Sequence, residues 1–561
     1  MSTDPVTTLA AVPDTVFVNA TVITVDPARP RAEALAVTAG RITAVGTEAQ
    51  VRALAGPLTE TIDLAGHTVL PGFVEAHGHP TVAMTIDGPD VVDIRPMTCP
   101  TAESVVATIR ETVAAAEPGE PLAFFGWDIL LQEGLEEPTK AWLDELAPGN
   151  PLAILQNSAH LSWGNSLAIE AIELTRDTVD PDGCHFERDE RGEPTGKAVE
   201  VPASLMMMGT PFNTSPERAP ELLAHEHDVL ASRGLTMTGD LGLRAAMRPV
   251  CAELAVTDRA KVRVRAYEMS DAAMRSGAAP GDGDSAGGAM FRQIGIKMWA
   301  DGSPWIGNIA TSFPYLNTPQ TAALGLALDH RGCANYTADQ VRDIIDAYFS
   351  EGWQLACHVH GDTAVEMLLD VFAEKLPEYD RPDHRTRFEH CGTMTADQYR
   401  RAARLGITCS LFVDHIYYWG DVLVDSLFGE RAHGWANARA ALDAGMRISF
   451  HNDAPVTPVE PLRNIQVAVT RRTRSGARVL GPEHRVDLDE AIRAQTADAA
   501  WQLQSEHEAG SIEIGKYADL VVLSENPYET DPHEIGDIEV LATYLAGAPT
   551  FTAAATPVTT T

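Results

Sequence analysis

Residues 68–80 constrain what this chain can fold into more than any other stretch, because they combine a turn, an apolar run and two imidazoles. A Pro-Gly turn at 71–72 leads into a short run that ends at His77 and His79, and Pro80 stops it. In a strand, side chains two positions apart point to the same face of the sheet. The two imidazoles are therefore expected to project side by side, as ligands of one metal ion must.

A second H-x-H pair, His225 and His227, has a different setting. It lies in a helical pattern over 216–233, where side chains two positions apart are about 200° apart around the axis and cannot share an ion. We interpret this pair as part of a solvated helix face. For His77 and His79, a pair of metal ligands is the better interpretation.

The long central part of the chain, residues 71–506, alternates β-like runs with helical patterns of about 10–15 residues. The helical pattern 338–351, for example, is followed by a β-like run at 353–360. Repeated units of this kind predict an α/β fold, here a TIM-like (β/α)8 barrel whose chemistry lies at the C-terminal ends of its parallel strands. Residues 81–230 are too long for two such units, so we expect an insertion there that covers the site.

Composition narrows the classes of function. The chain has 561 residues, 45% of them hydrophobic, which suffices for a large core, and its 79 acidic against 42 basic residues give a formal net charge of −37. That charge repels phosphate backbones and anionic membrane surfaces, so the sequence predicts neither a nucleic acid nor a membrane as partner. A small-molecule substrate is the expected partner, and a homo-oligomer is left open.

The start of the chain and its cysteines indicate where in the cell the protein is expected to be. No basic residue precedes Arg29 and no apolar run approaches the length of a membrane span, so neither a signal peptide nor a spanning helix is expected. The seven cysteines are odd in number, widely spaced and without a C-x-x-C pair, which indicates reduced thiols. Both observations predict a soluble, cytoplasmic protein.

Four later β-like runs carry residues that a metal site uses. Lys297 lies inside an apolar run, where an unpaired ammonium is very costly, so it needs a partner, and a salt bridge, for example to Asp301, is one possibility. His358 and His390 each close a β-like run, and Asp453 follows another. For Asp453 the alternative is a turn or N-cap residue.

The run VLPGFVEAHGHP at 69–80 resembles the first barrel strand of the amidohydrolase superfamily, a group of metal-dependent hydrolases. Three further motifs, at 295–303, 358–362 and 453–455, resemble amidohydrolase family 3, which includes N-substituted formamide deformylases. At 451 and 452 this chain departs from the superfamily pattern, with His and Asn in place of Gly and Ser. The resemblance extends from about residue 15 to 548.

This resemblance implies a ligand set in which a lysine of the fourth strand is carboxylated and bridges two metal ions. The implied metal ligands are His77, His79, Lys297, His358, His390 and Asp453. Ligands of mixed imidazole and carboxylate character suit zinc, with manganese, iron or cobalt as alternatives. Whether one ion or two are bound is left open.

Residues 510–523 resemble a signature near the end of many amidohydrolases, in which both chain ends form one small β-sandwich domain. The alternation of apolar and polar residues over 15–70 agrees with short strands at the other end. We therefore assign 1–70 and 507–561 to the sandwich, and 71–506 to the barrel with its insertion.

The expected substrate contacts come partly from the resemblance. The stretch 156–165 resembles a region of family 3 with a histidine and an asparagine near the substrate, which implies these roles for His160 and Asn165. Trp299 and Tyr417, among the aromatic residues near strand ends, are expected to line an apolar pocket, with core packing as the alternative.

The predicted activity is metal-assisted hydrolysis of the carbon–nitrogen bond of a small, apolar N-substituted amide. Asp453 takes a proton from metal-activated water and passes it to the leaving nitrogen. Deamination of a heterocycle is the alternative, but the H-x-x-E motif common in such enzymes has no clear counterpart here. An inactive scaffold is a further alternative, and the complete ligand set argues against it.

Overall fold

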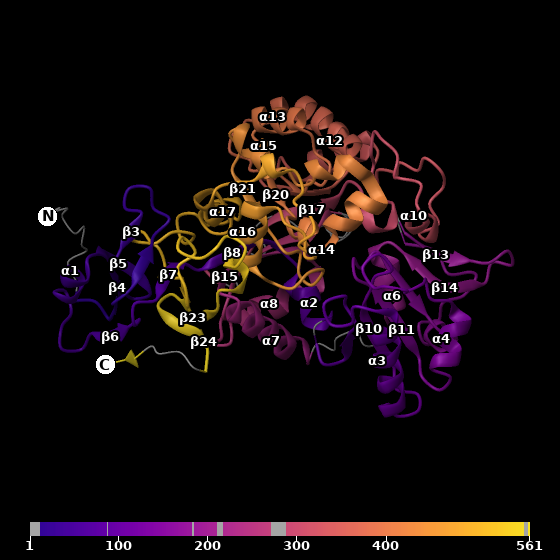
Figure 1. Ribbon diagram of the computed structural model, residues 1–561, viewed down its shortest axis with the longest axis horizontal. Coiled ribbons are helices and arrows are strands. Elements are labelled where there is room, and N and C mark those ends of the chain that lie inside the picture. The colour runs from indigo at the N-terminus through magenta and orange to yellow at the C-terminus, as the bar shows by residue number, and fades with distance from the viewer. Residues whose placement is uncertain are drawn as a thin grey trace.

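The computed structural model describes residues 12–86, 88–181, 184–209, 217–270, 288–554 and 559–560. At its centre is an eight-stranded sheet in the order β21-β20-β19-β18-β17-β16-β15-β8, in which every neighbouring pair is parallel (Figure 1). The strands are β8 (Phe73–Gly78), β15 (Leu235–Leu243), β16 (Arg263–Met269), β17 (Phe291–Trp299), β18 (Gln354–Val359), β19 (Arg387–His390), β20 (Thr408–Leu411) and β21 (Ile448–Phe450).

The two edge strands of this sheet come together and nearly close it. The backbone N–H of His79, just after β8, donates to the carbonyl of Ala454, just after β21, at 3.1 Å. The N–H of Asn452 donates to the carboxylate of Glu75 on β8 at 2.8 Å. The predicted TIM-like barrel is therefore confirmed.

Helices surround the barrel and bury one face each against it. They include α2 (Pro80–Ile86), α7 (Ala219–Ser232), α8 (Arg248–Ala255), α11 (Ala338–Tyr348), α12 (Asp362–Lys375), α13 (Ala396–Arg404), α14 (Asp414–Val422), α15 (Ala438–Asp443), α16 (Pro461–Thr470), α17 (Leu488–Ala494) and α18 (Ala497–Gln502). Among the described helices, none has the length and apolar character needed to cross a bilayer.

Helix α11 shows how the local sequence builds these elements. Thr337 accepts a hydrogen bond from the Gln340 N–H while the Gln340 side chain accepts one from the Thr337 N–H, which forms a capping box. Its buried residues, at 341, 344, 345 and 348, follow the spacing of a single helix face. The helix ends at Tyr348, three residues before the predicted end, because the chain turns at Gly352, which has a φ of 93°.

The insertion forms its own six-stranded sheet, in the order β13-β14-β12-β11-β10-β9. Its elements are β9 (Val91–Asp93), α3 (Ala102–Ala115), β10 (Leu122–Trp127), α4 (Lys140–Leu146), β11 (Leu152–Gln156), β12 (Leu161–Gly164), α5 (Ser166–Ala171), β13 (His185–Arg188), β14 (Pro194–Val199) and α6 (Val201–Met207). The indole N–H of Trp419 on barrel helix α14 donates to Asp128, just after β10, at 3.1 Å. The insertion is therefore joined to the end of the barrel where the predicted ligands lie.

Helix α7, which follows the insertion, corrects one detail. It packs against the barrel, so His227 is buried and accepts the backbone N–H of Lys261 at 3.2 Å, whereas His225 is exposed. The prediction that both imidazoles lie on a solvated face is wrong for His227, because residues two apart lie on opposite sides of a helix. Pro216, the predicted start of this helix, lies outside the described residues.

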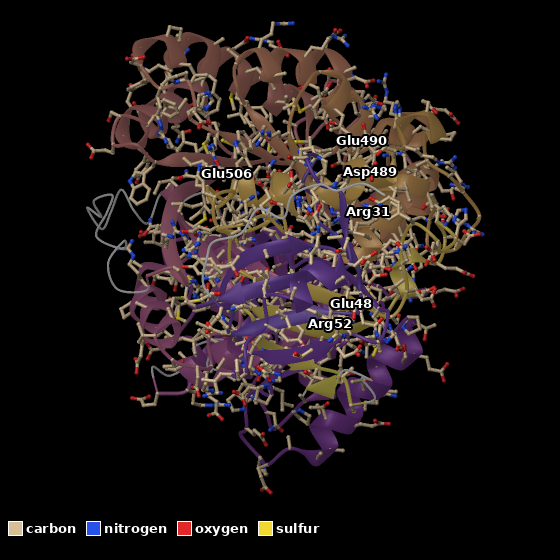
Figure 2. The ribbon with its side chains drawn as sticks, turned by 90° about the vertical axis from the view of Figure 1, so that its left-hand side faces the viewer. Arg31, Glu48, Arg52, Asp489, Glu490 and Glu506 are labelled. Atoms are coloured by element: carbon tan, nitrogen blue, oxygen red, sulfur yellow. The ribbon has the colours of Figure 1, made fainter. Side chains whose placement is uncertain are left out.

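Both chain ends contribute strands to two further sheets, in the orders β25-β6-β1-β4-β5 and β24-β23-β22-β7-β2-β3. The strands are β1 (Thr15–Val18), β2 (Thr21–Ile23), β3 (Arg31–Ala32), β4 (Ala34–Thr38), β5 (Arg41–Gly46), β6 (Glu60–Asp63), β7 (Thr68–Pro71), β22 (Leu520–Leu523), β23 (Val540–Leu545), β24 (Ala548–Thr552) and β25 (Thr559–Thr560). Figure 2 faces this side of the molecule, where a shared apolar cluster includes Phe17, Val69 and Leu520. That these sheets form a separate sandwich domain stays a prediction.

A buried ion pair ties the barrel to the C-terminal strands. Arg263 on β16 donates from two nitrogens to the carboxylate of Asp519 at 2.9 and 3.1 Å, and both side chains are 2% exposed. We expect Arg263→Met to lower the free energy of unfolding by about 3–5 kcal/mol, because it leaves a buried carboxylate uncompensated. Urea unfolding monitored by circular dichroism measures this.

The matched control is Arg342→Met, which removes an ion pair on the protein surface and should cost no more than about 1 kcal/mol. The double variant Arg263→Met/Asp519→Leu should regain most of the lost stability, because no unpaired charge remains buried. Equal losses for Arg263→Met and Arg342→Met would contradict the role assigned to this pair.

Candidate metal centre

The structure brings all six predicted metal ligands to one end of the barrel. Because the strands are parallel, residues at or after their C-terminal ends meet at the same rim. Asp453 Oδ1 lies 3.1 Å from His79 Nε2 and 3.3 Å from His77 Nε2, and Lys297 Nζ lies 3.2 Å from His77 Nε2. The rings of His358 and His390 are 4.4 Å apart, and the latter is 4.7 Å from the ring of His77.

The ligand atoms in this cluster lie close enough together to share metal ions. Three groups have donor atoms within 4.8 Å of one another. They are His77, His79 and Asp453; His358, His360 and His390; and His77, His390 and His451. Imidazole nitrogens and carboxylate oxygens at such separations are the donor set of zinc and similar divalent ions.

Two buried nitrogens support this interpretation independently. His390 Nε2 and His360 Nδ1 have no hydrogen-bond partner among the described residues. An unsatisfied buried polar atom costs about 1–3 kcal/mol, so such atoms are rare in native proteins. Burial, together with neighbouring imidazoles, also holds the pKa of both side chains well below the ordinary value, which keeps them in the neutral form that binds metals. The residues present therefore fit a divalent metal.

Hydrogen bonds outside the cluster orient two of the imidazoles. His77 Nδ1 lies 2.6 Å from the carboxylate of Glu389, so the proton is assigned to Nδ1 and Nε2 faces the cluster. Burial by itself would raise the pKa of Glu389, but Arg387 and His77 hold it well below its usual range. His358 Nε2 contacts the carbonyl of Gly302 at 3.1 Å, which leaves its Nδ1 toward the cluster.

Lys297 has no carboxylate partner among the described ion pairs. Asp301, the alternative salt-bridge partner, instead accepts the backbone N–H groups of His360 at 2.9 Å and Gly361 at 2.7 Å. Lys297 is fully buried, and burial lowers the pKa of its amine to about 8. The salt bridge to Asp301 is therefore excluded as the explanation for this lysine.

The ligand set predicted from the sequence left out three members of the cluster. His360 shares the H-x-H spacing with His358, which was a usable signal. His451 precedes Asp453 by two positions, but its ring stacks on that of His77 at 4.7 Å only because the barrel closes. Glu389 carried no signal, because its partner His77 is 312 positions away in the sequence.

Backbone conformation also marks this region. His390 and Asp453 have positive φ values of 70° and 55°, and Glu200 in the insertion has a φ of 69°. Residues other than glycine adopt this region rarely, at a cost of about 1–3 kcal/mol, and such residues cluster at functional sites.

Two of the predicted substrate contacts lie near the cluster. His160 Nδ1 is 2.6 Å from the carboxylate of Glu200, and its ring lies 6.1 Å from that of His358. Trp299 ends β17 two positions after Lys297, so strand alternation places both on the same face. Both remain candidates for substrate binding.

The other two predicted contacts need correction. The fully buried amide of Asn165 makes four hydrogen bonds, accepting the N–H groups of Leu152 and Ala168 and donating to the carbonyls of Ala147 and Asn150. This side chain caps helix α5 and has no group left for a substrate.

Tyr417 faces away from the cluster. On helix α14 the buried residues His415 and Trp419 are one turn apart and point inward, and Tyr417 lies two positions from both, about 200° around the axis. Its ring instead packs against the guanidinium of Arg463 at 5.1 Å. Trp419 stacks on Trp305, with ring centroids 4.7 Å apart, as part of the core.

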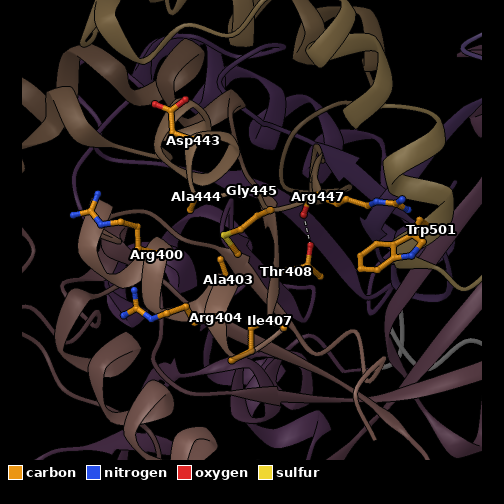
Figure 3. Close-up of a pocket in the computed structure, with 12 residues that line it drawn as sticks. Arg400, Ala403, Arg404, Ile407, Thr408, Asp443, Ala444, Gly445, Arg447 and Trp501 are labelled. Carbon is orange, nitrogen blue, oxygen red and sulfur yellow. Dashed lines mark hydrogen bonds between the residues drawn. The ribbon is translucent and has the colours of Figure 1, made fainter. Parts of the chain in front are cut away.

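A large hollow at the opposite end of the barrel does not belong to this site. It has a volume of about 560 Å³ and is lined by Arg400, Arg404, Arg447 and Trp501, among others (Figure 3). It lies where β20 and β21 begin, whereas the ligand cluster lies where the strands end. Chemistry in parallel barrels occurs at the C-terminal ends of the strands.

A barrel with imidazoles and a carboxylate at the C-terminal ends of its strands defines the class of metal-dependent hydrolases. The family model described as "Amidohydrolase family" matches residues 60–551. The chain therefore belongs to the amidohydrolase family, and it is a metal-dependent hydrolase that acts on carbon–nitrogen bonds.

Known proteins agree with this assignment. The chain is 30% identical over 549 residues to N-substituted formamide deformylase of Arthrobacter pascens, covering 95% of this chain and 97% of that protein. It is 27% identical over 553 residues to Protein LONG AFTER FAR-RED 3 of Arabidopsis thaliana, covering 96% and 91%. An uncharacterized metal-dependent hydrolase of Pyrococcus horikoshii OT3 is similar in structure, with a TM-score of 0.71 at 20% identity over 92% of this chain and 99% of that one, which supports the fold.

Proposed function

We propose that this protein hydrolyses the amide bond of small, uncharged N-substituted amides, with N-substituted formamides as the best substrates. The observation that carries the proposal is the convergence of six predicted ligands at one rim of the barrel, with two buried imidazole nitrogens left without partners. The similarity to a formamide deformylase over nearly the whole chain favours an amide with a small acyl group.

In this proposal the metal ligands divide between two positions, and zinc is the proposed metal. His77, His79 and Asp453 would hold one ion, His358 and His390 a second, and Lys297 would bridge them as a carboxylated lysine. Such ions, when bound, supply Lewis acidity that lowers the pKa of water and polarises a carbonyl group. The buried amine of Lys297, without a carboxylate partner, supports this use of the lysine.

The remaining steps belong to the side chains of the protein. Asp453 accepts the proton of the attacking water and delivers it to the leaving nitrogen, so that the amine departs neutral. Two imidazole nitrogens lie within 3.3 Å of its Oδ1, so the carboxylate stands beside the position proposed for the first ion. His160, held at Nδ1 by Glu200, presents Nε2 to orient the substrate carbonyl.

A substrate panel tests the proposal. We expect the kcat/KM of N-benzylformamide to exceed that of dipeptides and N-acyl amino acids by about tenfold or more, because the net charge of −37 disfavours anionic substrates and the proposed site is apolar on the nitrogen side. The panel should contain formamides, acetamides, lactams, N-acyl amino acids and aminopyrimidines, each assayed with zinc and with manganese. Amine release is the measured signal.

Two outcomes of the panel would contradict the proposal. Ammonia release from aminopyrimidines alone would favour the alternative activity, deamination of a heterocycle. Turnover restricted to N-acyl amino acids would preserve amide hydrolysis but exclude the uncharged, apolar substrate.

A further inference from the structure

A cavity of about 380 Å³ lies between the insertion and the segment that follows β17. We call it the side compartment; its walls include Trp127, Trp163, Ile306, Leu326, Cys333 and Glu200. Trp127 ends β10 and Trp163 lies on β12, with ring centroids 6.4 Å apart. These two indoles and the aliphatic side chains opposite give the compartment largely apolar walls of the size that small ligands occupy.

The inner end of the side compartment adjoins the metal cluster. Glu200 lines the compartment and holds His160, whose ring lies 6.1 Å from that of His358. Asn308, also in the wall, donates its amide to Glu200, and its carbonyl accepts the N–H of Gly302 at 2.8 Å. The carbonyl of Gly302 in turn contacts His358. A ligand that reaches from the cluster past His160 therefore enters this compartment.

The charges of the walls favour an uncharged occupant. Glu137 is paired with Lys197 at 2.6 Å and also accepts the indole N–H of Trp163 at 3.1 Å. Glu200 is paired with His160. Both carboxylates of the compartment are thus compensated, and a charged ligand would lose hydration without gaining a free counter-charge.

The two indoles of the walls favour an aromatic occupant. Trp127 and Trp163 both line the compartment, with ring centroids 6.4 Å apart. An aromatic ring gains binding free energy from a contact with another aromatic ring beyond the burial of its area. A saturated chain of the same size gains only from the burial.

We propose that the side compartment binds the substituent on the substrate nitrogen, preferably an aromatic ring, while the acyl group lies at the metal cluster. This inference rests on the proposed function, since it assigns a binding place to each of the two sides of the amide substrate. It also replaces the aromatic wall expected from the sequence, because Trp127 and Trp163 take the role that Tyr417 cannot.

Cys333 offers a readout that does not depend on catalysis. Six of the seven cysteines are buried, and Cys333, in the compartment wall, is exposed. The probe is N-benzylmethanesulfonamide, which keeps the benzyl–NH group but has no carbonyl carbon to attack. At about ten times its Kd, this probe should slow the reaction of Cys333 with a thiol reagent in the holoenzyme about tenfold.

Three controls accompany the labelling. Methanesulfonamide, which lacks the benzyl group, should give no protection, and Cys333→Ser should remove the labelling signal. In Trp163→Ala the protection should be lost. Equal labelling rates with and without the benzyl probe, or equal protection by methanesulfonamide, would overturn the inference.

Steady-state kinetics provide a second test of the inference, beside the labelling of Cys333. The ratio of kcat/KM for N-benzylformamide to that for N-methylformamide should fall about tenfold or more in Leu326→Trp, which fills the compartment from a half-buried position. The matched control Leu328→Trp lies on the same segment with 80% of its surface exposed, outside the walls, and should leave the ratio unchanged. An unchanged ratio in both variants would also overturn the inference.

The two arms separate this inference from the proposed function. If no amide in the panel is hydrolysed, the proposed function fails, and the labelling arm still decides whether the compartment binds the benzyl group. If amides are hydrolysed but Cys333 is not protected, the function stands and the compartment assignment fails.

Discussion

Replacing Asp453 by asparagine is expected to lower kcat by about 10²–10⁴-fold while the protein stays folded, because an amide cannot accept and return a proton. His77→Ala and His79→Ala should abolish hydrolysis, since each removes a nitrogen that lies within 3.3 Å of the Asp453 carboxylate. Steady-state kinetics on the best formamide, together with circular dichroism and metal analysis of each purified variant, measure these effects.

The chain supplies a matched control in the H-x-H pair of helix α7, which lies outside the cluster. His225 is exposed on helix α7, so His225→Ala makes the same substitution without touching the cluster, and both activity and metal content should be unchanged. Full activity of metal-depleted protein, or of His77→Ala, would end the metal-assisted mechanism.

Lys297→Ala should also have a large effect, lowering kcat/KM by more than about 100-fold, because even residues outside the ligand shell of a metal cost 10–100-fold. Lys297 is fully buried and has no carboxylate partner among the described ion pairs, and the proposed carboxylated form would give it a metal to bind. Carbon-13 NMR of protein equilibrated with labelled bicarbonate should show a carbamate signal that the variant lacks. Metal analysis should show the loss of an ion.

Rescue distinguishes a ligand from a structural residue. Short-chain carboxylic acids should restore part of the activity of Lys297→Ala, because they supply the missing anionic oxygens, and they should not affect the native enzyme. Lys261→Ala, at a half-buried lysine paired with Asp228, is the control and should behave as the native protein does. A variant without the carbamate signal that keeps its metal content and its activity would exclude the bridged pair of ions.

If the acyl group of the substrate lies at the metal cluster and its nitrogen substituent lies in the side compartment, the insertion determines which nitrogen substituent is accepted. The barrel alone provides the metal cluster, whereas Trp127, Trp163 and Glu200 all come from the insertion. Loops and insertions at the C-terminal face of such barrels carry specificity. Differences between relatives in this segment should therefore change the nitrogen substituent that is accepted more than the bond that is broken.

The sequence by itself determined the barrel and the order of the candidate ligands. Strand alternation is a local property, so His77 and His79 could be placed on one face without knowledge of the rest of the chain. Parallel strands end at one rim, so residues that close successive β-like runs were expected to meet there. The first inference needs only short-range geometry, whereas the choice of the six ligands came from the resemblance of their motifs to those of the superfamily.

Only the tertiary structure decided which side chains complete the cluster and which face the substrate. His77 meets Glu389 across 312 positions, a contact that no local pattern encodes. Asn165 and Tyr417 have residue types suited to a binding site. However, the Asn165 side chain caps helix α5, and Tyr417 lies on the face of helix α14 that points away from the cluster. The physical reason is that the role of a side chain depends on which polar groups around it still lack a hydrogen-bond partner. Its neighbours in space are set by the packing of elements that are distant in the sequence.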